Sequence, residues 1–217
     1  MREPIDKYWS RRLDDVSEAL EDNGFDVFRA EGEEDVRRIA LSEILPALSP
    51  RTVSFGGSTS VVSSGLYQAL KDVPGCDVLD VFDKTLSEPD KLELRRRALT
   101  CDLFVTGTNA LTEAGQLVNL DMIGNRVAAL AFGPRNVLVV LGRNKLAADL
   151  PAAMRRIKDY AAPVNASRLA KKTPCVKTSR CMDCNSPDRI CNVWTITEKS
   201  FPKGRIKVIL VNQDLGF

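Results

Sequence analysis

The chain has 217 residues, of which 44% are hydrophobic, and its 31 Lys and Arg residues nearly balance 29 Asp and Glu residues, leaving a formal net charge of +2. These values are typical of a folded domain with a sizeable core, and they exclude disorder throughout the chain and a dedicated nucleic-acid binder. The first residues are charged and no apolar stretch approaches roughly 18–20 residues, so we expect no secretory signal, no membrane span and a cytoplasmic protein.

The first quarter of the sequence alternates helical and strand patterns. Apolar residues at near-helical spacing predict a helix over about residues 4–22. Residues 25–28 alternate apolar and polar side chains, which is typical of a short strand. A second helix is predicted at about residues 33–47 and a second strand at residues 52–55.

The same alternation continues to residue 106. A tight turn at residues 56–60 leads into a helix that contains Val62 to Leu70. Strands are predicted at residues 77–82 and 102–106, with a helix at about residues 87–99 between them. Strands that alternate with helices in this way favour parallel pairing.

Two continuous apolar runs, residues 127–132 and 137–141, have the pattern of strands that are covered on both faces. A last helix is predicted at about residues 149–161, and residues 206–211 have the pattern of one more strand. The sequence therefore predicts an α/β fold with an open, mostly parallel sheet flanked by helices.

The carboxyl-terminal quarter has a different composition. Residues 160–182 contain several Lys and Arg residues, and four cysteines lie between residues 175 and 191. We expect an α/β domain over residues 1–165, a small cysteine-rich metal-binding insertion over 166–195, and a final strand within 196–217 that rejoins the sheet.

The turn after the second strand has the composition of an anion-binding loop. Gly56 and Gly57 allow the backbone to turn sharply and to approach a ligand, and Ser58 and Thr59 add hydroxyl groups. Ligands of open α/β sheets usually bind at this edge of the sheet. The alternative is a simple turn in which Ser58 or Thr59 caps the next helix.

The absence of histidine restricts the chemistry to other side chains, because Ser–His and Cys–His pairs are impossible. Glu113 is the best candidate for a general base or a carboxylate nucleophile, since a dry cleft raises the pKa of a carboxyl group. Asn109, a second catalytic candidate, and Asn119 would orient a carbonyl or carboxylate group, and Arg126 would bind an anion.

Thr108 and Asp121 complete the candidate binding residues of this segment. The alternative interpretation is a structural polar network in which Asp121 and Arg126 cap turns, because buried polar clusters often have no other role.

Four cysteines within 17 residues favour a metal site over disulfides in a chain that is not secreted. Their number suits both a zinc site with four thiolates and a [4Fe–4S] cluster. A single Cys-x2-Cys pair is present, whereas zinc ribbons favour two, so we expect the cluster and keep zinc as the alternative. The four residues are Cys175, Cys181, Cys184 and Cys191.

The segment Thr106–Gly115, with residues 119–121 and 124–126, resembles the LUD domain family of lactate-utilisation protein C-like proteins. The turns at residues 55–58 and 132–134 also fit this family. The cysteine segment is similar to that of a subset of short family members from anaerobic bacteria.

This resemblance implies a fold similar to the ribose-5-phosphate isomerase and CoA-transferase superfamily. It also implies a role in oxidising L-lactate to pyruvate, as one subunit beside iron–sulfur oxidoreductase partners. Ligands of related folds lie where the turn at residues 56–60 and the Glu113 loop would converge. We therefore expect an anionic metabolite as ligand and no nucleic acid or membrane partner; pairing into a homodimer is left open.

Two other functions remain open from the sequence. The first is an isomerase- or transferase-type enzyme with Glu113 as base or nucleophile and a structural zinc ion. The second is a non-enzymatic scaffold or regulatory subunit that zinc stabilises.

Overall fold

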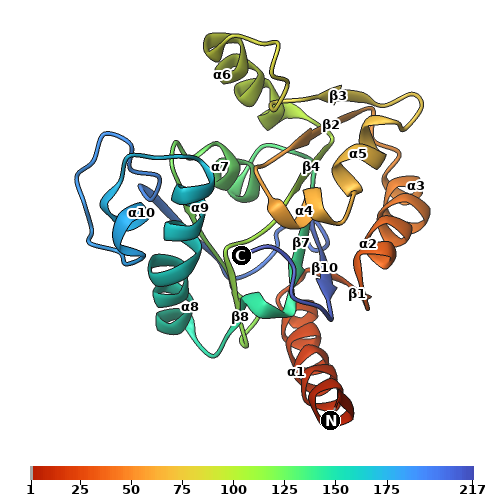
Figure 1. Cartoon of the computed structure of the whole chain (residues 1–217). Coiled ribbons are helices and arrows are strands. Elements are labelled where there is room, and N and C mark those ends of the chain that lie inside the picture. The colour runs from red at the N-terminus through yellow and green to blue at the C-terminus, as the bar shows by residue number, and fades with distance from the viewer. Residues whose placement is uncertain (1) are drawn as a thin grey trace.

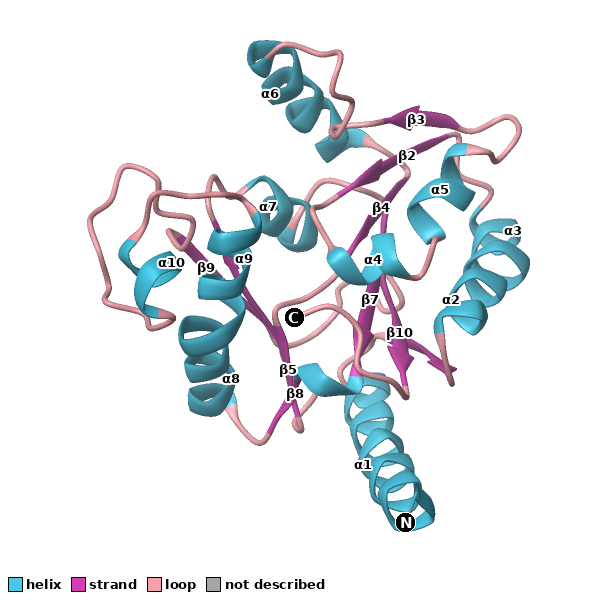
Figure 2. Ribbon diagram, viewed as in Figure 1, coloured by secondary structure: helices cyan, strands magenta, loops and turns pink. Residues whose placement is uncertain are grey.

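A computed structural model describes residues 2–217 and shows a six-stranded parallel sheet with helices on both faces (Figure 1). A second, smaller sheet lies beside it (Figure 2). The order of the large sheet is β1-β10-β7-β4-β2-β3, and all of its pairs are parallel. The predicted open, parallel α/β architecture is confirmed. Its strands are β1 (Asp26–Ala30), β2 (Thr52–Phe55), β3 (Asp77–Leu79), β4 (Leu103–Thr106), β7 (Asn136–Gly142) and β10 (Ile206–Val211).

Strand β7 shows why the centre of this sheet has such an apolar sequence. Val137, Val139 and Leu141 pack on one face, and Leu138 and Val140 pack on the other. Successive side chains of a strand point to opposite faces of the sheet. Because helices cover both faces, the side chains on both sides of β7 are apolar.

The two faces are covered by different parts of the chain. One face contacts α1 (Arg2–Asp22) through Leu13, Val16 and Leu20, which recur at helical spacing. The other face is covered by helices between β1 and β3 (Figure 2). These are α2 (Glu33–Ile39), η1 (Ala40–Ile44), α3 (Leu45–Leu48), α4 (Thr59–Ser63) and α5 (Leu66–Lys71).

The second sheet has the order β8-β5-β6-β9 and carries its own apolar cluster. Its central pair, β5 and β6, is antiparallel. The sequence patterns did not predict this sheet, because its strands are two to five residues long and too short to show a period. They are β5 (Ala110–Thr112), β6 (Leu117–Asp121), β8 (Leu146–Ala147) and β9 (Val193–Thr197).

The sequence predicted a strand over residues 127–132, but residues 127–131 belong to α7 (Asn125–Ala131), and Phe132 follows the helix in an extended conformation. A carboxylate oxygen of Asp121 accepts the backbone N–H groups of Arg126 and Val127 and so caps the helix start. A short apolar run is ambiguous between a buried strand and a buried helix. The tertiary position of Asp121 decides the outcome here.

Two further boundaries differ from prediction. Strand β3 ends at Leu79, because the carboxylate of Asp80 accepts the backbone N–H of Phe82 and forms a turn. The last predicted helix continues beyond residue 161. It consists of α8 (Leu150–Arg156), η4 (Ile157–Ala161) and α9 (Ala162–Arg168).

The cysteine segment lies between α9 and β9 and contains one short helix, α10 (Pro174–Thr178). From β9 the chain returns to the large sheet, where β10 lies between β1 and β7. Three other short elements are α6 (Glu88–Arg97), η2 (Ala98–Thr100) and η3 (Arg143–Lys145). No helix within the described residues is long and apolar enough to cross a membrane.

Candidate functional site

A cleft of about 770 Å³ opens at the carboxyl ends of the central strands of the large sheet. Residues 57–59 follow β2, residues 107–109 follow β4 and Lys145 follows β7, and all of them line this cleft. Adjacent parallel strands deliver their loops to one edge, which is where open α/β sheets bind ligands. The predicted site residues that the structure brings to the cleft are Gly57, Ser58, Thr59, Thr108, Asn109, Asp121 and Arg126.

Glycines allow two of these loops to pack directly on each other. A Cβ atom on Gly56 would lie 2.5 Å from Oγ1 of Thr106, and one on Gly107 would lie 2.5 Å from Oγ of Ser58. Gly56 therefore lies behind the floor of the cleft, and its role is close packing. Ser58 Oγ accepts the backbone N–H of Val61 at 3.3 Å, so Ser58 caps α4 while it also borders the cleft.

Arg126 is the centre of a buried hydrogen-bond network. Its Nη2 and Nε donate to the same carboxylate oxygen of Asp121, Oδ1, at 2.8 and 2.9 Å, and its Nη atoms also donate to the side-chain carbonyl oxygens of Asn109 and Asn119. The backbone carbonyls of Gly107 and Leu120 accept the remaining donors. Arg126 therefore holds the cleft loops together, as in the structural-network interpretation, and its donors are already engaged.

Asn119 is fully buried behind this network and does not border the cleft. Its side-chain oxygen accepts the hydroxyl of Thr108 at 3.2 Å and the backbone N–H of Asn109 at 3.2 Å. Asn119 thus positions two cleft residues, and the structure does not place it where it would contact a ligand.

Glu113 does not lie in the cleft, contrary to the expectation that its loop converges with the turn at residues 56–60. Asn109 precedes β5 and Glu113 follows it, so the strand carries the two residues apart. The side chain of Glu113 is 50% exposed and pairs with Arg12 of α1. Glu113 therefore lies at the surface and not in the dry cleft expected from the sequence.

Lys145 is the cleft residue that the sequence patterns did not single out. It is 3% exposed, and its Nζ donates to Oγ of Ser60 at 2.9 Å and to the carbonyl oxygen of Thr108 at 3.1 Å. Burial, together with the positive charges of Arg156 and Arg126, lowers the pKa of Lys145 from 10.5 to about 7. The one sequence feature that points to Lys145 as a site residue is its position shortly after a buried central strand, because open α/β sheets bind ligands at the carboxyl ends of their strands.

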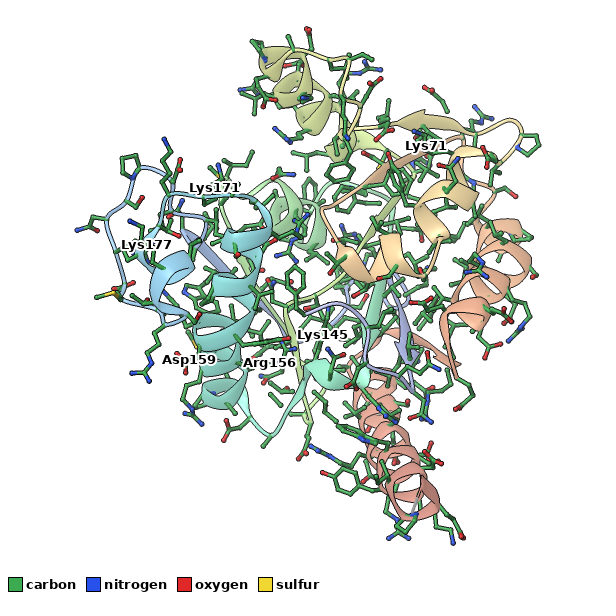
Figure 3. The ribbon with its side chains drawn as sticks, viewed as in Figure 1. Lys71, Lys145, Arg156, Asp159, Lys171 and Lys177 are labelled. Carbon is green, nitrogen blue, oxygen red and sulfur yellow. The ribbon has the colours of Figure 1, made fainter. Side chains whose placement is uncertain are left out.

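Arg156 of α8 fixes the surroundings of this lysine. Its guanidinium group donates to the carbonyl oxygens of Asn109 at 2.8 Å and of Asn144 at 3.1 Å. Figure 3 shows Lys145 and Arg156 within the interior of the ribbon. Arg156 therefore ties the loop after β4 to the loop after β7.

The cleft has a positive rim and an apolar wall. Arg95, Arg168 and Lys171 line it together with Arg126 and Lys145, against the two acids Glu88 and Asp121. This balance favours an anionic ligand. The apolar wall consists of Val81, Phe82, Leu92, Leu120, Met122, Ile123, Leu169, Ile190 and Phe217.

All four cysteines of the carboxyl-terminal segment border one small cavity of about 20 Å³, and their thiols are free. Two cationic side chains, Lys158 and Arg189, border the same cavity and bind Asp183. Arg189 also donates to the carbonyl oxygens of Cys184 and Cys191, which holds the loop in place.

The spacing of these thiols can be compared with the two candidate metal groups. A single zinc ion needs four sulfurs about 2.3 Å from one centre. Within residues 2–217, no three acidic or cysteine side chains are grouped closely enough to hold one ion. In a four-iron cluster each thiolate binds a different iron, so the sulfurs lie farther apart. Within residues 2–217 the structure therefore shows four free thiols around one small cavity and no preformed ligand set for a single ion.

Comparison with known proteins gives a family match, matches among solved structures and one negative result. The model of a family described as the LUD domain matches residues 13–211. The crystal structure of a DUF162 family protein from Deinococcus radiodurans has a similar fold, with a TM-score of 0.51 and 15% sequence identity over 94% of this chain and 98% of that chain. Among curated proteins, no match is found.

Proposed function

The chain belongs to the LUD domain family, and from this premise we propose that it is a lactate-utilisation-type subunit whose cleft binds a small organic acid or a related anion. The observation that carries this proposal is the positive cleft at the carboxyl ends of β2, β4 and β7. A cleft of about 770 Å³ also leaves room for a ligand larger than lactate.

The groups available to an anion are the Lys145 amine and the hydroxyls of Ser58 and Thr59. Arg126 holds the loops around the anion in place, because its charge is paired with Asp121 and its donors are occupied by Asp121, asparagine side chains and backbone carbonyls. The apolar wall would exclude water and strengthen these interactions. In this role the residues bind and orient the acid.

We further propose that Cys175, Cys181, Cys184 and Cys191 hold a [4Fe–4S] cluster. When bound, such a cluster would exchange single electrons with an iron–sulfur oxidoreductase partner. Ile190 borders both the cysteine cavity and the cleft, so this residue is a shared wall of the two sites. This shared wall supports a joint role for the two sites in the oxidation of lactate to pyruvate.

Ligand binding is tested by calorimetric titration of the purified protein with L-lactate, pyruvate and inorganic phosphate. We expect saturable binding of at least one carboxylate, and weaker binding by Lys145→Met than by the wild-type chain. Lys71→Met is the matched control, because Lys71 lies outside the cleft and pairs with Asp80. Absence of binding of all three anions at millimolar concentration would overturn the proposal.

The cluster is tested by iron and sulfide analysis and by the visible spectrum of anaerobically purified protein. About four irons and four sulfides per chain are expected. Replacement of all four segment cysteines by serine should remove both, whereas Cys76→Ser, outside the segment, should not. One zinc ion per chain and no visible colour would indicate a structural role for the segment instead of a redox role. A protein that contains neither iron nor zinc would overturn the electron-transfer proposal.

A further inference from the structure

Lys145 is a buried amine that has no acidic partner among residues 2–217. Its Nζ donates to the Ser60 hydroxyl and to the Thr108 carbonyl oxygen, and no carboxylate contributes to its electrostatic environment. A buried ammonium group without a counter-ion is costly, so burial favours the neutral amine. The lysine therefore differs from a residue whose task is to hold an ion pair.

Lys71 provides the contrast within the same chain. Its Nζ lies 2.7 Å from a carboxylate oxygen of Asp80, and this hydrogen bond raises the pKa of Lys71. Around Lys145 the charged groups are guanidinium groups, Arg156 from α8 and Arg126 from α7, and together with burial they lower its pKa to about 7. Asp121 faces Arg126 and pairs with it.

The consequence is a nucleophile at neutral pH. With a pKa of about 7, about half of the Lys145 side chains are neutral at pH 7, against roughly one in 2,500 for a lysine with a pKa of about 10.4. A neutral amine has a free electron pair, which is the requirement for attack on a carbonyl carbon.

We propose that Nζ of Lys145 forms an imine with the carbonyl group of a 2-oxocarboxylate bound in the cleft. The electron pair of the amine attacks the carbonyl carbon, two protons move to the carbonyl oxygen, and water leaves as the C=N bond forms. No oxidant or further reactant is consumed. Lys145 borders the cleft, so the carbonyl carbon can approach it from the side that holds Ser58 and Thr59.

This inference rests on the proposed function for the ligand class, since it requires that the cleft accepts a small organic acid. It adds a covalent step that binding alone does not need. The hydroxyls of Ser58 and Thr59, which line the cleft together with Lys145, would hold the carboxylate while the amine reacts.

The test is reductive trapping of the full chain with pyruvate or glyoxylate and sodium cyanoborohydride at pH 7, followed by intact-mass and peptide mass spectrometry. One adduct per chain, located on Lys145, is expected. The neutral fractions predict labelling of Lys145 on the order of a thousandfold faster than that of an ordinary surface lysine. Lys145→Arg should lose the adduct, and Lys71→Met should retain it.

The outcomes separate this inference from the proposed function. Calorimetric binding of pyruvate without an adduct on Lys145 would overturn the imine and leave the anion-binding proposal in place. Adducts spread over many lysines would also overturn it, because they would show no special reactivity. If pyruvate neither binds nor labels the chain, both proposals are overturned. The peptide map of the wild-type chain gives this result even where a variant fails to fold.

Discussion

At the residue scale, the cleft contains two buried cations that are accommodated in different ways. Arg126 is neutralised by Asp121 and uses its donors within the protein. Lys145 has two neutral hydrogen-bond partners, and its pKa is lowered instead. A guanidinium group cannot lose its proton under ordinary conditions, whereas an amine can, and this difference explains the two solutions.

The lowered pKa of Lys145 predicts a pH-dependent stability. The unfolded chain, with a lysine pKa of 10.5, binds more protons than the folded chain between pH 7 and pH 10.5, so this group makes stability rise with pH across that window. Lys145→Met removes the effect. From pH 7 to pH 9 the wild-type chain should gain about 2 kcal/mol relative to the variant. Urea unfolding at both pH values measures this, and equal changes in the two proteins would contradict it.

Glu113→Gln tests the position of the carboxylate outside the cleft. The pair with Arg12 is partly exposed, so its loss should cost less than about 1 kcal/mol of unfolding free energy. Binding of pyruvate should be unchanged within error, since Glu113 does not line the cleft. Thermal unfolding and calorimetry are the measurements. A loss of binding with retained stability would restore Glu113 as a site residue.

At the element scale, the site depends on the close packing of strand ends. The segments after β2 and β4 approach so closely that Gly56 and Gly107 have no room for a Cβ atom. The loops after β4 and β7 are joined by Arg156, and Asp121 caps α7. The cleft floor is therefore a set of loops that hold one another.

Gly56→Ala should destabilise the chain by about 1–3 kcal/mol, because the new Cβ atom would overlap Thr106 and Arg126. Gly57→Ala is the matched control, since its Cβ atom would meet only Phe82 at 3.9 Å. That variant should change stability by no more than about 0.5 kcal/mol. Equal midpoints for the two variants in chemical unfolding would show that the packing of this turn does not matter.

At the scale of the whole molecule, two sheets meet around the cleft, and the cysteine segment leads into β9 of the smaller sheet. The large sheet supplies the floor, and β6, α7 and α9 supply residues of the opposite wall. The cysteine loop follows α9 and leads into β9, which pairs with β6. The proposed metal site is thus part of the scaffold that forms one side of the cleft.

The excess of cations around the cleft predicts a salt-dependent affinity. Screening shortens the range of these charges, so raising sodium chloride from about 0.05 M to 0.5 M should weaken pyruvate binding by roughly threefold or more. The neutral analogue lactamide, if it binds, should show no such dependence. Calorimetric titration at the two salt concentrations measures both ligands, and a salt-independent affinity for pyruvate would argue against electrostatic binding.

The sequence by itself determined the elements whose patterns are local. The helix near the amino terminus, the central strands β7 and β10, and the glycine turn after β2 all follow from side-chain periodicity and turn composition. The resemblance to the LUD domain family, carried by the segment from Thr106 to Gly115, is confirmed by the family match.

Tertiary structure decided what depends on distant partners. The run at residues 127–131 became a helix because Asp121, from β6, caps it. Glu113 became exposed because β5 carries it away from the cleft, and Lys145 became buried because Ser60, Thr108 and Arg156 enclose it. The periodicity of apolar residues indicates which face of a helix or strand is buried. The burial and the pKa of a charged group depend on chain segments that are remote in sequence.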